Sequence, residues 1–516
     1  MSPAAPSAPP RHRALITASV VLGSLLYSID WTIAVVALPH MQGTFSATQD
    51  QISWVITSYV VASAIMMPTG GWLSHRFGRK RVLVWALVGF TVASVFCGSA
   101  ESLGIEVLAR IIQGMSGAYL IPLSHAIILD TYPQEEHGKA MALWGMGSVM
   151  GSVIGPTIGG YLTEFASWRW IYYINIPLGL IALSGVLAFL PETQRDPRRR
   201  FDWLGFLTLA LGVGALQMML DRGQRLDWFE SGEIVVLACL SGLGLYLFAA
   251  HTATTREPFL DPRLLTNRKF LMTLLLFSLY GFLTLPPMVL MPAFLEHLRG
   301  YNVDAVGLLQ SPRGVGMIMA LFIGGRIAGR IDPRSIIAAG LVGLGLSNYE
   351  MSTWTDEVGE WPIVWTGLLQ GIGAGIMLVP IQIIAFPSLA PSQRTEATSI
   401  FNLVRSVFSS VGVSVMLTML VVTSTAVRSR LAEYISPYSA ALRSAQQSGA
   451  FDSTTAHGLA ILERQVERQA SLAGYNADFF FLGVAALSAL PLLLLIGRPG
   501  RASAEDREQS EMLLAE

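Results

Sequence analysis

Ionisable residues inside apolar runs are the first candidates for chemistry in this chain. Asp30 stands nine residues before Pro39, and Arg110 stands eight residues after Ser102. If both runs are helices that begin or end at one surface, a rise of 1.5 Å per residue puts both side chains roughly 12 Å below it. This matched depth predicts an ion pair, although Glu106, one helical turn from Arg110, could pair with Arg110 instead.

Two interpretations of these three residues stay open. An ion pair can simply hold two helices together. Alternatively, a carboxylate that faces a cavity inside a membrane can take up and release protons, because buried charge there is costly and is usually functional. The candidate proton-coupling residues are therefore Asp30, Arg110 and Glu106.

Two further arginines lie within apolar runs that supply no acid of their own. Arg313 stands in LLQSPRGVG and Arg405 in FNLVRSVFSS. Each needs a partner from another helix, a carbonyl, water or an anionic substrate group, so structural and cavity-lining roles are equally compatible with these positions. The candidate substrate-cavity residues are Gln113, Asn402, Arg313 and Arg405.

The composition indicates which kind of protein carries these residues. Of 516 residues, 52% are hydrophobic and 13% are charged, whereas a soluble domain carries about 25% charged residues. Fourteen apolar runs are long enough to cross a bilayer, which predicts an all-α polytopic membrane protein with fourteen transmembrane helices. The predicted helices are 14–38, 52–73, 81–100, 102–130, 138–163, 168–190, 202–220, 233–251, 269–295, 303–326, 335–353, 361–386, 396–424 and 476–497.

Charge placement predicts the orientation of these helices. An even number of helices puts both termini on one side of the membrane. If that side is the cytoplasm, 22 of the 34 Lys and Arg residues are cytoplasmic, nine are on the opposite side and three are inside helices. The positive-inside rule therefore places both termini in the cytoplasm. The predicted location of the chain is the inner (plasma) membrane of the cell. The net charge of −1 lacks the basic footprint of a nucleic-acid-binding protein.

An internal repeat divides the chain. Gln113-Gly114 recurs as Gln370-Gly371, an offset of 257 residues that is much longer than six helices. The surplus matches the helix pair within 202–251, so the predicted plan is six helices, two inserted helices and six more, as in transporters with a central site between two halves. The predicted regions are a cytoplasmic tail 1–13, an N-terminal half 14–191, an inserted region 192–268, a C-terminal half 269–497 with an extracytoplasmic loop 425–475, and a cytoplasmic tail 498–516.

Two glycine-containing motifs and the long loop complete the candidates. Residues 145–160, GMGSVMGSVIGPTIGG, put four glycines on one helix face beside a proline, which suits either static packing or a sliding surface. Residues 71–80, GWLSHRFGRK, carry basic residues that anchor the loop in the cytoplasm or pair with Asp130 as a latch.

Within 425–475, AHGLAILERQVERQASLAG has helical apolar spacing, which indicates a surface helix or a docking element. The candidate conformational residues are Gly71, His75, Arg76, Gly78, Arg79, Asp130, Gly151, Gly155, Pro156 and Gly159.

Taken together, these motifs resemble those of the major facilitator superfamily, and specifically its fourteen-helix drug:proton antiporters of the EmrB/QacA subfamily. The matches are Asp30-Trp31-Thr32 through Ala37-Leu38-Pro39, the loop 71–80, Arg110-x-x-Gln113-Gly114, Gly151 to Gly160, and WRWIYYINIPLG at 168–179. One residue departs from the loop motif, because His75 stands where many members have Asp. A histidine there makes a latch pH-sensitive or removes it.

The resemblance implies a secondary transporter with no cofactor or metal, namely a proton-driven multidrug efflux antiporter that exports amphipathic, often cationic compounds. The segment 425–475 resembles the periplasmic segment of members that act with a membrane-fusion adaptor and an outer-membrane channel, which implies the inner-membrane pump of a tripartite system. Two alternatives stay open. One is a dedicated exporter of a metabolite, siderophore or fatty acid with the same fold, and the other is a membrane sensor or scaffold without transport.

Overall fold

The computed structural model describes residues 12–193, 200–255, 257–328, 330–386, 389, 393–435 and 455–495. These residues are predominantly helical, and their one isolated β-bridge joins Ala328 to Ile331. Twelve helices are long and apolar enough to cross a membrane, or thirteen if one bent pair forms a single span. The all-α membrane fold is therefore confirmed. The count of fourteen stays a prediction, because the helix at the eleventh predicted position, α16, is not among those twelve.

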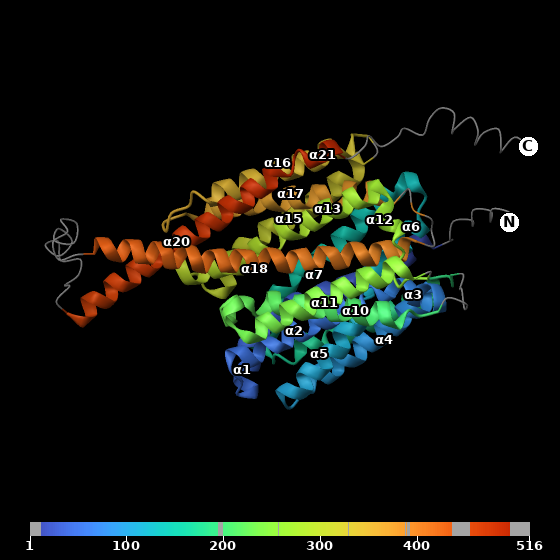
Figure 1. Cartoon of the computed structure of the whole chain (residues 1–516), viewed down its shortest axis with the longest axis horizontal. Coiled ribbons are helices and arrows are strands. Elements are labelled where there is room, and N and C mark those ends of the chain that lie inside the picture. The colour runs from blue at the N-terminus through green and yellow to red at the C-terminus, as the bar shows by residue number, and fades with distance from the viewer. Residues whose placement is uncertain are drawn as a thin grey trace, which may run out of the picture.

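The helices follow the predicted plan of two halves with an insertion between them (Figure 1). The N-terminal half contains α1 (Arg13–Phe45), α2 (Gln49–Met66), α3 (Thr69–Phe77), α4 (Arg79–Gly98), α5 (Leu103–Gly117), α6 (Leu120–Thr131), η1 (Gln134–Glu136), α7 (His137–Phe165), α8 (Trp170–Tyr173) and α9 (Asn175–Phe189). The inserted region contains α10 (Trp203–Arg222), η2 (Gly223–Leu226), η3 (Trp228–Glu230), α11 (Gly232–Thr254) and α12 (Arg263–Thr266). The C-terminal half contains α13 (Arg268–Thr284), α14 (Pro286–Ala293), the π-helix η4 (Phe294–Leu298), α15 (Val303–Ile327), α16 (Pro333–Met351), α17 (Glu360–Ala385), α18 (Arg394–Tyr434), α20 (Ala456–Ser488) and α21 (Leu492–Leu495).

The predicted helix 52–73 is broken in the structure. Helices α2 and α3 meet at an angle of 56°. Pro68 stands at the break and is followed by Gly70 and Gly71. A proline removes one helical hydrogen bond, and glycine is a poor helix former. This sequence therefore bends where a uniform apolar run predicts a straight helix.

Most of the described part of the predicted loop 425–475 is helical. Helix α18 continues to Tyr434 and α20 begins at Ala456, so the two helices form a hairpin that projects beyond the bundle (Figure 1). The helical spacing seen in AHGLAILERQVERQASLAG is confirmed. Residues 436–454 of this stretch lie outside the described residues, as do 1–11 and 498–516 of the two predicted tails.

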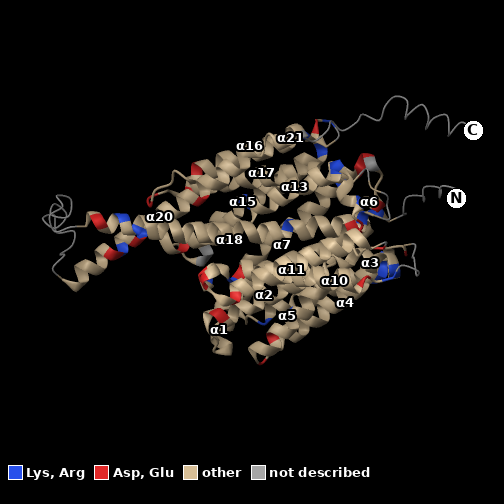
Figure 2. Ribbon diagram, in the orientation of Figure 1, with Lys and Arg blue, Asp and Glu red and all other residues tan. Residues whose placement is uncertain are grey.

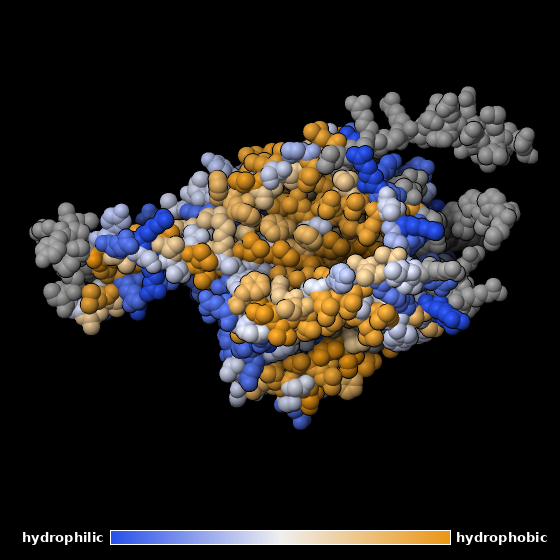
Figure 3. Space-filling view, in the orientation of Figure 1, coloured by the Kyte–Doolittle hydropathy of each residue, from blue (hydrophilic) through white to orange (hydrophobic). Residues whose placement is uncertain are grey.

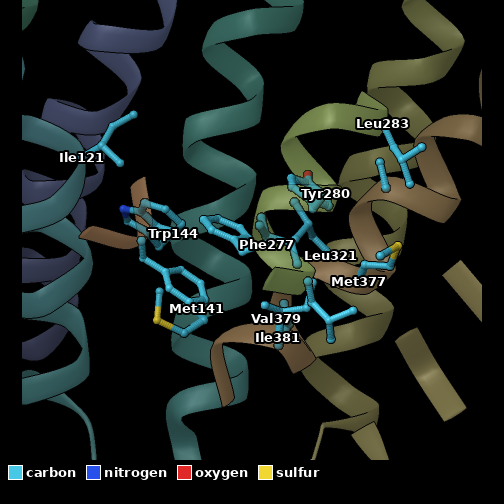
Figure 4. Packing of buried hydrophobic residues seen from close by; sticks show 14 of the residues in the cluster. Ile121, Met141, Trp144, Phe277, Tyr280, Leu283, Leu321, Met377, Val379 and Ile381 are labelled. Atoms are coloured by element: carbon cyan, nitrogen blue, oxygen red, sulfur yellow. The ribbon is translucent and has the colours of Figure 1, made fainter. Parts of the chain in front are cut away.

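The two halves share one hydrophobic core, and the outside of the bundle is apolar as well. Side chains from α6, α7, α13, α15 and α17 pack together where the halves meet, among them Trp144, Phe277, Leu321 and Met377 (Figure 4). Exposed large apolar side chains cover the bundle surface, whereas Lys and Arg gather near α3, α6 and α21 and on the hairpin (Figures 2 and 3). An apolar belt between charged ends is the surface that a bilayer requires. We call the end with the α3–α4 turn the basic end.

The inserted helices are attached to both halves. Asp221 of α10 accepts a hydrogen bond from Thr57 of α2. On the other side, Gln217 of α10 donates a hydrogen bond to Ser410 of α18, and Trp228 Nε1 donates to Thr418 Oγ1 at 2.9 Å. The insertion therefore bridges the N-terminal and C-terminal halves along one side of the bundle.

Candidate functional site

Asp30 lies at the centre of a buried polar cluster in the N-terminal half. The exposed fraction of its side chain is 0%, as is that of Arg110 and Gln113 of α5. Arg110 Nη1 donates to Asp30 Oδ2 at 2.6 Å, so the ion pair predicted from their depth is present. Asp30 Oδ1 accepts further hydrogen bonds at 2.7 Å from Gln113 Nε2 and from Asn175 Nδ2 of α9. A carboxylate that accepts from three donors, one of them cationic, is well arranged for its ionised form.

A second layer of contacts fixes the donors. Gln113 Nε2 also donates to Ser94 Oγ of α4 at 2.8 Å, and Gln113 Oε1 accepts from Arg110 Nη1 at 2.6 Å. Arg110 Nε donates to the carbonyl oxygen of Val55 at 3.1 Å, and its guanidinium lies 4.1 Å from the ring centre of Tyr59. The pair is therefore held from α1, α2, α4, α5 and α9, so any movement that separates Asp30 from Arg110 must disturb several helices together.

Glu106 lies on the same helix as Arg110 but does not pair with it in the structure. Its exposed fraction is 0%, and neither carboxylate oxygen makes a hydrogen bond of ordinary geometry within the described residues. The alternative in which Glu106 is the partner of Arg110 is therefore not the arrangement seen. Burial away from water and from any ion-pair partner favours the neutral, protonated form of this carboxyl.

Sequence reasoning missed two members of the cluster, Asn175 and Ser94. Both have an exposed fraction of 0%. Neither residue is charged, and an amide or a hydroxyl inside an apolar run does not stand out in the sequence as a charge does. The available signal was that Asn175 interrupts the apolar run 168–190, where an uncharged polar side chain still needs a buried partner.

The glycine motif positions the helix that carries Asp30. A Cβ atom on Gly151, Gly155 or Gly159 would overlap α1 at Ser28, Thr32 or Ile33. These glycines therefore let the backbone of α7 approach α1 closely, and α7 runs through Pro156 as one helix. The motif faces α1 rather than the other half, which α7 contacts through Val153 and Gly145.

The loop motif brings the two halves together at the basic end. Gly71 of α3 lies so close to α18 that a Cβ would be 3.1 Å from Glu396 Cα. Gly78 has a φ of 89°, a conformation that favours glycine, and this turn starts α4 at Arg79.

Asp130 of α6 forms ion pairs with residues from both halves. One partner is Arg79 of α4, and the other is Arg394 of α18, whose Nη1 lies 2.7 Å from Asp130 Oδ1. Arg79 Nε also donates to Thr395 Oγ1 of α18 at 2.7 Å. The predicted pairing of the loop with Asp130 is present, while His75 and Arg76 lie in the last turn of α3.

The four expected substrate-cavity residues have different surroundings in the described conformation. Gln113 belongs to the Asp30 cluster described above, and Asn402 is 3% exposed and donates to Thr398 of its own helix. Arg313 donates to the carbonyl oxygen of Thr284 at 2.5 Å and lines a small pocket in the C-terminal half. Arg405 of α18 lies 5.9 Å from the ring centre of Phe277 and has no acidic partner within the described residues. The assignment of all four residues to a substrate cavity stays a prediction, because burial in this conformation does not decide which side chains face substrate in another.

A polytopic helical bundle with two joined halves and polar residues buried inside it is the architecture of many membrane transporters. The family model of the Major Facilitator Superfamily matches residues 20–296 and 271–429, and the chain belongs to that superfamily. It is 32% identical to the multidrug export protein EmrB of Escherichia coli over 427 residues, which cover 82% of this chain and 83% of that protein. It is also 32% identical to the fatty acid resistance protein FarB of Neisseria gonorrhoeae over 491 residues, covering 94% and 96%.

Solved structures support the fold. The human organic anion transporter MFSD10 has a TM-score of 0.65 at 16% identity, covering 93% of this chain and 99% of its own. The proton:xylose symporter XylE has a TM-score of 0.61 at 13% identity, covering 94% and 96%. At these identities the likeness concerns the fold alone, and the expected major facilitator fold is confirmed.

Proposed function

We propose that this chain is a proton-driven multidrug efflux antiporter. The observation that carries the proposal is the ion pair of Asp30 with Arg110, buried inside one half of a transporter fold and completed by Gln113 and Asn175. An intramembrane carboxylate whose counter-ion can be withdrawn is a suitable proton carrier. The similarity to proteins named multidrug export protein EmrB supports drugs as the substrate class.

In the proposed cycle, the negative charge of Asp30 is neutralised alternately by Arg110 and by a bound proton. In the described conformation Arg110 neutralises the carboxylate, and the site is sealed because both side chains have an exposed fraction of 0%. When helices of the N-terminal half shift, Arg110 moves away and Asp30 binds a proton that enters from the extracytoplasmic side. The proton leaves to the cytoplasm when Arg110 returns, and substrate binding on that side favours this release. Glu106 is a second group in this half that is able to hold a proton.

We propose that the chain lies in the inner (plasma) membrane of the cell. The basic end and both termini then face the cytoplasm. The excess of Lys and Arg predicted for that side supports this orientation. Asp130 then latches the two halves on the cytoplasmic side through Arg79 and Arg394. Opening toward the cytoplasm breaks this latch, so it stabilises the conformation described here.

The α18–α20 hairpin is proposed to bind a periplasmic membrane-fusion adaptor, which would link the pump to an outer-membrane channel. The hairpin projects beyond the bundle, and it exposes apolar side chains there, with Tyr434 79% and Leu459 53% exposed. A photo-crosslinker placed at Leu459 is expected to capture the adaptor, and one placed at exposed Trp361 is not. Capture at both positions or at neither would contradict the assignment.

A specific observation favours fatty-acid export as the second candidate. The Arg405 guanidinium has no acidic partner within the described residues and lies beside Phe277, a combination of cation and apolar surface that suits an amphipathic anion. The 32% identity to FarB points the same way. Competition between a cationic dye and a fluorescent fatty acid separates this candidate from multidrug efflux.

The test is transport of a fluorescent cationic dye by the full chain in liposomes with an imposed pH gradient. The native chain is expected to move the dye until an uncoupler is added, and Asp30→Asn is expected to abolish this movement. Glu164→Gln, an exposed acid of the same half, is the matched control and should transport like the native chain. Gradient-driven transport that survives Asp30→Asn would contradict the proposal.

A further inference from the structure

A second buried carboxyl lies in the C-terminal half, outside the site described above. Asp478 of α20 has an exposed fraction of 0%. Neither oxygen of its carboxyl group has a hydrogen-bond partner within the described part of the chain. This contrasts with Asp30, whose two oxygens accept from Arg110, Gln113 and Asn175.

No cation within the described residues neutralises Asp478. The ion pairs of α20 lie further out on the hairpin, where Arg428 contacts Glu463 and Glu467, and Arg468 contacts Asp356. Arg468 is ten residues from Asp478, or about 15 Å along the helix axis. The titratable groups near this level include Tyr475 of α20, Tyr349 and Glu350 of α16, and Glu296 and His297 of η4. None of them forms a hydrogen bond or ion pair with Asp478 within the described residues.

The surroundings of Asp478 are aromatic and apolar. The ring of Tyr475 lies 5.5 Å from that of Phe294, and the ring of Phe479 lies 6.3 Å from that of Trp354. An ionised carboxylate in such a place lacks both donors and counter-ion, which is strongly unfavourable. The neutral acid is the form that the site accommodates, so in this conformation Asp478 holds a proton.

The position of Asp478 corresponds to a polar position in the other half. Gly179 of α9 packs against Thr91 of α4, and in the same way Gly483 of α20 packs against Gly345 of α16. Asn175 stands four residues before the first of these glycines and Asp478 five residues before the second. The sixth long helix of each half therefore buries a polar side chain at nearly the same level. In the N-terminal half this residue contacts the proton-coupling carboxylate, and in the C-terminal half it is itself a carboxyl.

We propose that Asp478 is a second proton-carrying residue of the transport cycle. It holds one proton in the described conformation and releases it when α18 and α20 move apart and water reaches the carboxyl. Because α18 and α20 also form the projecting hairpin, the release accompanies movement at the base of the hairpin. The inference rests on the proposed proton-driven antiport, and it adds a second proton to the one carried by Asp30.

The protonation state is tested without any transport. Infrared spectra of the purified full chain in lipid are recorded for the native protein, Asp478→Asn and Asp30→Asn. We expect two carbonyl bands of buried protonated carboxylic acids, one from Glu106 and one from Asp478, and the second disappears in Asp478→Asn and persists in Asp30→Asn. Two unchanged bands in Asp478→Asn would overturn the inference, whether or not the protein transports anything.

The role in the cycle is tested by proton release on addition of tetraphenylphosphonium to weakly buffered protein. We expect Asp478→Asn to release about half as many protons per bound cation as the native chain, and Asp478→Glu to restore the native value, because each of two carriers contributes equally. Tyr475→Phe is the matched control and should release the native number. Native release from Asp478→Asn would overturn the second-carrier role. Release from neither the native chain nor any variant, with the infrared band still lost in Asp478→Asn, would instead count against the proposed antiport and so against the carrier role that rests on it.

Discussion

The repeated Gln-Gly positions of the two halves share their packing and differ in their chemistry. Gly114 of α5 lies against the carbonyl oxygen of Tyr59 in α2, and Gly371 of α17 lies against the carbonyl oxygen of Arg313 in α15. The preceding glutamines are both buried, but their partners are different. Gln113 contacts a full ion pair, whereas among the described residues Gln370 Nε2 contacts Asn348 Oδ1 at 3.3 Å and the sulfur of Met351 at 3.9 Å.

The internal repeat therefore preserves a contact between two helices rather than a chemical site. Small residues are retained at the close approach of two helices in both halves, while the polar side chains beside them are free to diverge. The N-terminal half concentrates charge in a satisfied cluster. In the C-terminal half, Asp478 and Glu396 are buried, while Arg313 and Arg405 are half-buried.

The largest loss of stability is expected from Arg110→Ala in the N-terminal half. It leaves the Asp30 carboxylate buried without its counter-ion, which should lower the free energy of unfolding by about 3–5 kcal/mol. Thermal unfolding in detergent measures the loss. The double variant Arg110→Ala with Asp30→Asn should recover part of the stability, and failure to recover any would contradict the pairing as the cause.

The next largest loss of stability is expected when α7 can no longer approach α1 closely. Gly155→Ala places a methyl group into Thr32, so we expect a loss of about 1–3 kcal/mol in stability. Gly160→Ala is the control on the same helix, because a Cβ there has no neighbour within 4 Å. That variant should be neutral or slightly stabilising, since alanine favours a helix over glycine. Equal losses in both variants would refute the assigned role of the motif.

The two repeated glutamines give the most direct comparison of the halves. Gln113→Ala should cost about 1–3 kcal/mol because it leaves buried charged groups short of a partner, while Gln370→Ala should cost only about 0.5–1.5 kcal/mol. Chemical unfolding of both variants tests the order. A larger loss for Gln370→Ala would show that the polar sites are more alike than their contacts indicate.

The smallest effect on stability is expected at the latch. Asp130 is partly exposed, with 29% of its side-chain surface accessible, so Asp130→Asn should change stability by only about 0.2–1 kcal/mol. The conformational equilibrium should respond more strongly. Spin labels at exposed Lys139 and Arg330 on opposite halves should show a broader distance distribution in Asp130→Asn, and an unchanged distribution would argue against a latch.

The fold and part of the site were predictable from the sequence because they depend on strong local signals. Long apolar runs predict the membrane helices, and the placing of Asp30 and Arg110 inside such runs predicts their pairing. The helix end assumed for Asp30 was wrong, because α1 continues through Pro39 to Phe45. Asn175 was missed because its partners come from α1 and α4, far away in the sequence.

The full length of the helical hairpin and the burial of Asp478 were not predicted, for a related reason. The run of charges after residue 424 hides helices that extend beyond an apolar span, since hydropathy reports the membrane and not the helix. Asp478 then fell at the start of the predicted last span, where a charge is ordinary, whereas the true helix begins at Ala456 and buries it. Burial of a given helix face depends on the neighbouring helices, which a single helix sequence does not specify.

The central claim is that Asp30 couples transport to protons without being needed for substrate binding. The most direct measurement compares two modes of dye transport by Asp30→Asn in liposomes, namely exchange of dye for dye at equal pH and accumulation driven by a pH gradient. We predict that exchange continues while gradient-driven accumulation is lost. Loss of exchange together with accumulation, or retention of both, would contradict the claim.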